Sequence, residues 1–158
     1  MTALADWAPN PHALIVHLPI GLLVTAFGVD LLALVRTANR LTLSNVATGL
    51  YVAGTVMLVV AYQTGRAGAA EVFTPGMAQA VVTQHWDQAL WCVWYFGLAT
   101  AGRIGLRRLR PRLGLGAMTG LAVVGLGGFL LLAMTAELGG RLVYEHGVGV
   151  AAPLEGGP

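Results

Sequence analysis

The chain has 158 residues, of which 56% are hydrophobic and only 10% are charged, and its formal net charge is +2. Soluble domains carry about 25% charged residues, so this composition excludes an ordinary soluble protein. It predicts an integral membrane protein that contacts lipid and binds no nucleic acid.

Four apolar stretches are each long enough to cross a hydrocarbon core of about 30 Å, which takes about 20 helical residues. They cover residues 13–35, 44–63, 84–102 and 114–134. The last is expected to extend as far as 146, because Glu137, Arg141 and Glu145 follow one another at helical spacing. The sequence therefore predicts an all-α, four-transmembrane-helix, up-down bundle. Residues 1–150 form its single domain, and residues 151–158 form a disordered tail.

The first stretch has recognisable start signals. Asn10 is positioned to cap a helix and Pro11 suits its first turn. Pro19 then removes the hydrogen bond to the carbonyl of Ile15 and is expected to bend the helix. No basic region precedes the apolar run, so we expect a retained membrane span and no cleaved signal peptide.

The arginines predict the orientation. Seven of the nine lie in the first and third loops, at positions 36, 40, 103, 107, 108, 110 and 112. Arginine-rich short loops face the cytoplasm, so both termini are expected on the outer, periplasmic side. Asp30 is the acidic residue nearest the inner side, and we expect it to pair with Arg36 or with a backbone group.

Small residues recur four positions apart along three of these helices. The pairs are Gly49 with Ala53, Gly97 with Ala101, and Gly116 with Gly120. Such pairs allow helices or a flat macrocycle to approach the backbone closely. Ordinary helix packing is the interpretation we favour for most of them.

Four histidines fall toward the outer face of the membrane: His12, His17, His85 and His146. Imidazoles are costly in hydrocarbon, so their gathering at one depth indicates a site. Counting about 20 residues outward from the arginine boundary places His17 and His85 at one level, and His12 and His146 beyond it.

Histidines from facing helices hold haem in membrane cytochromes. The lower pair, His17 with His85, predicts one haem b, and the upper pair, His12 with His146, predicts a second. The lone Cys92 and the lack of a CxxCH motif exclude covalent c-type attachment. The alternative for each histidine is a hydrogen-bonded residue at the membrane surface.

Arg66 and Arg141 are the two arginines on the outward side, against the charge bias. Arginine binds carboxylates in a forked geometry, so both are candidate partners of haem propionates. The alternative is that they pair with Glu71, Glu137 or Glu145.

Three segments carry a family resemblance: HALIVHLPIGLLVTAFGVDLLAL at 12–34, TGRAGAA at 64–70 and ELGGRLVYEHGVGV at 137–150. With His85, they resemble the DUF2231 family of small bacterial four-helix membrane proteins, over nearly the whole chain. The family's relatives include fusions to Rieske-type iron–sulfur or c-type cytochrome domains. The resemblance thus implies a cytochrome-b-like protein, and carries the family's histidines over as His12, His17, His85 and His146.

We therefore expect a subunit of the bacterial inner membrane that holds one or two haem b groups near its periplasmic face. It would transfer electrons within a larger redox complex containing a c-type cytochrome or an iron–sulfur protein, and quinol binding is compatible with this role. No catalytic constellation is present, so we do not expect an enzyme acting alone. Two alternatives stay open. One is a non-haem copper, iron or zinc site using His17, His85 and a carboxylate such as Glu137 or Asp87, and the other is a cofactor-free anchor or assembly subunit.

Overall fold

The computed structural model describes residues 11–69, 74–110 and 112–149. The helices in chain order are α1 (Pro11–Ile15), α2 (His17–Val35), η1 (Thr37–Asn39), α3 (Arg40–Gly68), η2 (Gly76–Ala78), α4 (Gln79–Leu109) and α5 (Leu115–Tyr144). The expected cap at Asn10 and the expected disordered tail at 151–158 lie outside the described residues.

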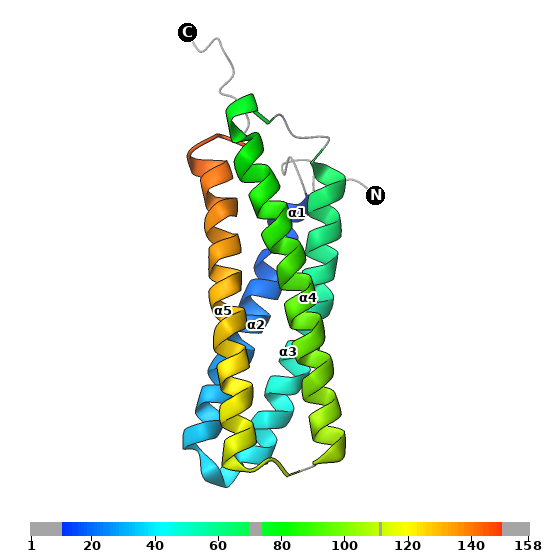
Figure 1. The fold of residues 1–158 in the computed structure, drawn as a ribbon, viewed down its shortest axis with the longest axis vertical. Coiled ribbons are helices and arrows are strands. Elements are labelled where there is room, and N and C mark those ends of the chain that lie inside the picture. The colour runs from blue at the N-terminus through cyan, green and yellow to red at the C-terminus, as the bar shows by residue number, and fades with distance from the viewer. Residues whose placement is uncertain (1–10, 70–73, 111, 150–158) are drawn as a thin grey trace.

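The helices α2 to α5 stand side by side as an up-down bundle, with the start of α1 and the end of α5 at the same end of the molecule (Figure 1). Helix α2 packs against α3 and α5, and α4 packs against the same two helices. The bundle is therefore a ring in which α2 and α4 face one another across the diagonal. The short helix α1 continues the line of α2 and packs against α3.

The predicted spans are confirmed as helices, and most are longer than expected. Helix α4 begins at Gln79 and ends at Leu109, beyond both of its predicted ends. The predicted extension of the last helix is confirmed through Gly139 and Gly140 as far as Tyr144 in α5. Helix α3 begins at Arg40, four residues before its predicted start. The apolar-run criterion locates the part of each helix suited to hydrocarbon, whereas the backbone hydrogen bonds continue into its polar ends.

The regular helix of the first span is interrupted at Val16, between α1 and α2, although Val16 keeps helical dihedrals of φ −58° and ψ −28°. The Val16 N–H still donates to the carbonyl of His12 at 2.9 Å. Pro19 has no N–H to donate to the carbonyl of Ile15, so the ladder is broken one turn before the proline.

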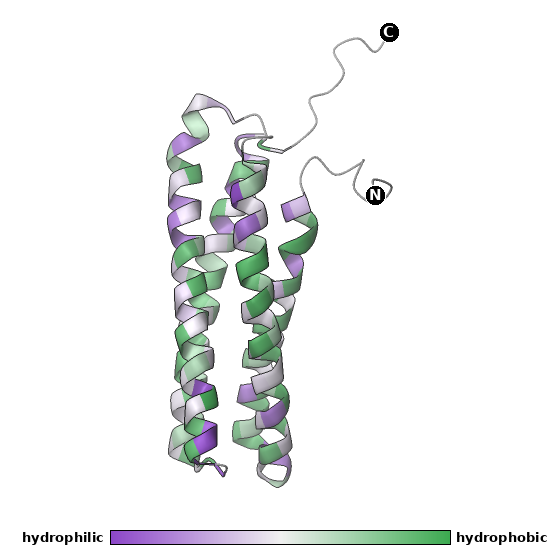
Figure 2. Cartoon of the chain, turned by 90° about the vertical axis from the view of Figure 1, so that its right-hand side faces the viewer, coloured by the Kyte–Doolittle hydropathy of each residue, from purple (hydrophilic) through white to green (hydrophobic). Residues whose placement is uncertain are grey.

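Within the described residues, three helical segments are long and apolar enough to cross a membrane, namely Pro11–Val35, Thr37–Gly68 and Leu115–Tyr144. Apolar residues fill the middle of the helices, whereas hydrophilic residues gather toward the two ends (Figure 2). Large apolar side chains such as Leu31, Val56 and Val123 are exposed on the outer surface of the bundle, as lipid contact requires. Helix α4 is not among the three, since its first half contains several polar residues.

The core is built around Leu23, Tyr51, Phe96 and Leu132. Two glycines of other helices receive these large side chains: a Cβ on Gly54 would lie 2.7 Å from Leu23, and a Cβ on Gly128 would lie 2.7 Å from Phe96. The glycines predicted to mediate packing are different ones. A Cβ on Gly49, Gly97, Gly116 or Gly120 would meet no heavy atom within 4 Å in the part of the chain that the structure describes. That prediction was wrong, because spacing alone does not identify the inward face of a helix.

Candidate functional site

His12 of α1 and His85 of α4 line one cavity at the end of the bundle where α1 begins. The cavity has a volume of ≈ 60 Å³. Its other lining residues are largely apolar and come from all the long helices, among them Val16, Pro19, Leu58, Cys92, Leu132 and Thr135. Two imidazoles from diagonally opposite sides of the ring thus share an otherwise apolar space.

Each of these imidazoles is oriented by a helix carbonyl. His12 Nδ1 lies 2.8 Å from the carbonyl oxygen of Ala61 in α3, and His85 Nδ1 lies 3.1 Å from that of Thr135 in α5. A carbonyl oxygen only accepts hydrogen bonds, so Nδ1 carries the proton in both rings. In the neutral imidazole the lone pair is then on Nε2, the tautomer in which histidine ligates metals through that atom.

Each imidazole also lies against a glycine one turn beyond its carbonyl partner. A Cβ on Gly65 would come within 3.0 Å of the His12 ring, and a Cβ on Gly139 would come within 3.3 Å of the His85 ring. Both glycines follow the carbonyl residue by four positions. The absence of a side chain at these two points is what allows the rings to lie so close to the helix backbones.

These contacts follow a pseudo-two-fold relation between the hairpins α1–α2–α3 and α4–α5. His12 and His85 are 73 positions apart, which is also the separation of Asp30 and Arg103. The distance in sequence from imidazole to carbonyl partner is 49 residues in the first hairpin and 50 in the second. The relation is not evident as a repeat in the sequence, because only some of the equivalent positions, such as those of the two histidines, hold the same residue.

The lining of the cavity obeys the same relation. Val16 and Pro19 of the first hairpin correspond to Ala89 and Cys92 of the second. Lining residues of α3 correspond in the same way to lining residues of α5, but 74 positions apart in the sequence instead of 73. These pairs are Leu58 with Leu132, Ala61 with Thr135, and Tyr62 with Ala136. The cavity therefore lies between the two hairpins, and each contributes one imidazole.

The pairing expected from depth differs from this geometry. His17 is exposed, its Nδ1 bonds to the carbonyl of Ala13 in α1 at 3.0 Å, and it does not line the cavity. The partner that faces His85 across the cavity is His12, from the other expected tier. Counting residues from a boundary gives the depth of a side chain and leaves open the side of the helix on which it lies.

His146 lies apart from the cavity, in the turn that follows α5. Gly147 adopts the left-handed conformation, with φ 64°, and the Val148 N–H donates to the carbonyl of Leu142 at 2.8 Å. The chain folds back, so that Val148 packs against the cluster containing Ala78 and Leu142. Both ring nitrogens of His146 are buried and have no hydrogen-bond partner among the described residues.

Arg66 and Arg141, the two arginines expected on the outer side, have different surroundings. The guanidinium of Arg66 lies 5.9 Å from the ring centroid of Trp86 and 3.4 Å from the hydroxyl of Tyr62, a cavity-lining residue. Arg66 is exposed and lies close to the cavity. Arg141 instead pairs with Glu145 at 3.0 Å, the alternative predicted for it.

A second polar cluster, which the sequence did not predict, lies toward the other end of the bundle. Arg103 of α4 donates two hydrogen bonds, each 2.7 Å long, to the two carboxylate oxygens of Asp30 in α2. Both side chains are almost fully buried, at 3% and 1% exposed. Asp30 therefore pairs across the diagonal of the bundle with Arg103, and the expected partner Arg36 was wrong.

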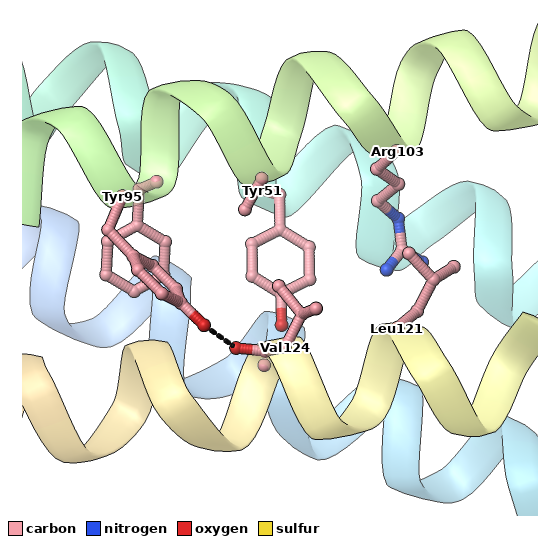
Figure 3. Close-up of a pocket in the computed structure, with 8 residues that line it drawn as sticks. Tyr51, Tyr95, Arg103, Leu121 and Val124 are labelled. Atoms are coloured by element: carbon pink, nitrogen blue, oxygen red, sulfur yellow. Dashed lines mark hydrogen bonds between the residues drawn. The ribbon is translucent and has the colours of Figure 1, made fainter.

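Further polar groups hold this arginine in place. Its Nε donates to the hydroxyl of Thr48 at 2.9 Å, and its guanidinium carbon lies 5.1 Å from the ring centroid of Tyr51. Figure 3 shows Arg103 beside Tyr51, with Tyr95 donating to the carbonyl of Val124 nearby. One sequence signal could have indicated this cluster. Arg103 lies four residues before the next arginine, Arg107, and so deeper in the apolar helix than the rest of the arginine group.

The donor chemistry of the cavity fits a haem iron, which takes two axial ligands from the protein and the others from the porphyrin. The volume is below the 300–1,000 Å³ or so of small-molecule sites. A metal ion therefore fits the cavity as it stands, whereas a macrocycle requires the hairpins to separate. The carboxylates suggested as further ligands, Asp87 and Glu137, are exposed and do not line the cavity.

The apolar helices and the apolar surface define a helical membrane protein. The sequence profile of the DUF2231 family, described as predicted membrane proteins, matches residues 9–152. The chain belongs to this family. No curated protein and no solved structure matches it.

Proposed function

We propose that this chain is a haem-b-binding subunit that transfers electrons in a bacterial cytoplasmic membrane, with His12 and His85 as the residues that would hold the iron of one haem. The observation that carries the proposal is the matched pair of imidazoles. They come from two hairpins, line one cavity, and both hold the Nδ1 proton on a helix carbonyl. Two such ligands complete the protein's share of a haem centre.

Bound haem supplies reversible one-electron chemistry. The chain's residues orient and insulate that chemistry. The carbonyls of Ala61 and Thr135 fix the rotation of the imidazoles and make them more basic ligands. The apolar lining keeps water away from the site, which tunes the reduction potential. Arg66, held near the cavity by Tyr62 and Trp86, is the cation we assign to a haem propionate.

The membrane arrangement follows from the arginine distribution. We propose that α4 crosses the bilayer with the other three long helices, because it runs beside them over its full length. The arginine-rich end then faces the cytoplasm and the histidine end faces the periplasm. A c-type cytochrome or an iron–sulfur protein on the periplasmic side is the partner that this position suits, and a quinol is a further donor to be tested.

A second candidate function is binding of a non-haem metal ion, and the cavity volume of ≈ 60 Å³ favours it. Two imidazoles leave further coordination positions for water or a ligand. Such sites in proteins use three or more protein ligands, and a pair of imidazoles is short of that number. We therefore place haem first.

The test is the spectrum of the full chain purified from bacterial membranes with haem synthesis supported. A reduced-minus-oxidised spectrum and a pyridine haemochromogen assay are expected to give one haem b per chain. His12→Ala and His85→Ala are each expected to abolish binding. His17→Ala is the matched control, since His17 is an exposed histidine on the same helical segment, and it is expected to retain the haem.

Four outcomes contradict the proposal. A colourless protein without iron removes the cytochrome interpretation, and copper or zinc found without haem promotes the second candidate. Loss of haem in His17→Ala with retention in His12→Ala restores the pairing predicted from depth. A second haem that is lost in His146→Ala contradicts the single-site stoichiometry.

A further inference from the structure

The polar pairs at the two ends of the bundle share the same helices. Asp30 follows His12 by eighteen positions, and Arg103 follows His85 by the same number. Eighteen residues make five turns of an α-helix, and Val16, between α1 and α2, keeps helical dihedrals of φ −58° and ψ −28°. His12 and Asp30 on the α1–α2 segment, and His85 and Arg103 on α4, therefore each lie on one face, about 27 Å apart along the axis. The ion pair and the imidazole pair therefore both lie on the diagonal between the α1–α2 segment and α4.

The helices of this diagonal are not packing neighbours, since α2 and α4 each pack against α3 and α5. The axial position of α2 relative to α4 is therefore set indirectly, through the packing of each against α3 and α5. The Asp30–Arg103 contact joins the diagonal helices directly, through two hydrogen bonds of 2.7 Å with fixed fork geometry. A bidentate contact of this kind defines one axial register.

We infer that Asp30 and Arg103 are positioning residues: the buried ion pair fixes the axial register of α2 against α4 and thereby sets the alignment of His12 and His85. A slip of one residue at the ion pair translates a whole helix by about 1.5 Å. Because α-helices are stiff along their axis, the same displacement reaches the imidazole five turns away. The inference rests on the proposed function, in that the His12–His85 pair is the element being aligned.

The surroundings of the pair support positioning. Thr48 of α3 accepts a further hydrogen bond from Arg103, and Thr100 of α4 lies 2.9 Å from Thr55 of α3, oxygen to oxygen. Arg103 is thus tied to two other helices at one level. Buried ion pairs are weak contributors to net stability and are best attested as devices that specify register.

The decisive variant is the double substitution Asp30→Leu with Arg103→Leu, which removes the pair without leaving a buried unpaired charge. Asp30→Glu is the second variant, since it retains the charge and lengthens the contact by one methylene. Arg108→Gln serves as the control for loss of an arginine from α4, because Arg108 is exposed and lies on the same helix as Arg103. The full chain in detergent is titrated with haemin, and the Kd is taken from the absorption change.

We expect the double leucine variant to bind haemin about tenfold more weakly, the lower end of the effect of removing groups that orient a metal ligand. Asp30→Glu is expected to show a smaller loss. A folded double variant with a Kd within twofold of the unmodified chain overturns the inference, because a merely structural pair replaced by packed leucines leaves the affinity unchanged.

A second measurement reads the register without haem. Nitroxide labels are attached at Leu14→Cys in α1 and Leu90→Cys in α4, which are 42% and 40% exposed, and their distance distribution is measured by pulsed EPR. Removing the ion pair is expected to shift or broaden it by about 1.5 Å. An unchanged distribution overturns the inference. If the unmodified chain binds no haemin, the proposed function fails, and the label distances still decide the register.

Discussion

The imidazole of His12 lies directly on Gly65, where an added Cβ would approach the ring to 3.0 Å. At the other side of the cavity His85 lies on Gly139, with a corresponding distance of 3.3 Å. The two glycines thus determine how close each ring lies to the helix that orients it. Contacts as short as 3.0 Å require the ring to move by a few tenths of an ångström when a methyl group is added.

Gly65→Ala is therefore expected to weaken haem binding, and Gly139→Ala to do so less, because its contact is looser. Neither substitution is expected to unfold the protein, since alanine in a helix interior is favoured over glycine by up to about 1 kcal/mol. The measurement is the haemin Kd together with the midpoint potential of the bound haem.

Gly97→Ala is the matched control, because a Cβ there would meet no heavy atom within 4 Å in the described part of the chain. It is expected to leave the Kd unchanged and to raise stability by up to about 1 kcal/mol. Equal losses of affinity in Gly65→Ala and Gly97→Ala would contradict the role of the glycine contact.

The buried ion pair has a distinct prediction for stability. Arg103→Leu alone leaves the Asp30 carboxylate buried and unpaired, which is expected to cost about 3–5 kcal/mol in the free energy of unfolding. The double substitution Asp30→Leu with Arg103→Leu removes both charges and is expected to recover most of that loss. Unfolding in mixed micelles by a denaturing detergent measures both. A double variant that is as unstable as the single one would show that Arg103 stabilises the bundle chiefly through Thr48 and Tyr51.

The exposed pair Arg141–Glu145 provides the contrast. Its members are 42% and 52% exposed and four residues apart on one helix, and such pairs contribute about 0.3–0.5 kcal/mol. Glu145→Gln is expected to change the free energy of unfolding by no more than about 0.5 kcal/mol in the same assay. A larger loss would indicate that Arg141 has a second role at the outer end of α5.

The helices and their order were predictable, because long apolar runs and prolines act locally. Pro19 predicted the interruption at Val16 for this reason. The ends of α3 and α4 were placed too far inside, since the hydrophobic criterion describes the lipid environment and helical hydrogen bonds continue beyond it. The end of α5 was predicted to within two residues, because the spacing of Glu137, Arg141 and Glu145 indicated a helix that continues beyond its apolar run.

The site was predictable only in part. His85 and His12 were among the candidate residues, but depth counting paired His85 with His17. Which side of a helix faces the bundle depends on its rotation, and strongly apolar helices carry little amphipathic signal to define that rotation. The Asp30–Arg103 pair was not predicted for the same reason, because the rotation of the two helices was unknown. One pattern in the sequence does relate the two pairs. Asp30 follows His12 by eighteen residues and Arg103 follows His85 by eighteen, which places the two members on the same face of their helical segment.

The orientation in the membrane can be tested on two exposed residues at opposite ends of the bundle. Met77 lies in η2 near the histidine end and is 81% exposed, and Leu109 ends α4 at the arginine-rich end and is 83% exposed. Met77→Cys is expected to react with a membrane-impermeant maleimide in cells with a permeabilised outer membrane, whereas Leu109→Cys is expected to react only after the inner membrane is opened. The native Cys92 is fully buried and supplies a low background. Labelling of Leu109→Cys in intact spheroplasts would reverse the orientation and place the cavity of His12 and His85 at the cytoplasmic face, where its electron-transfer partner would then have to be sought.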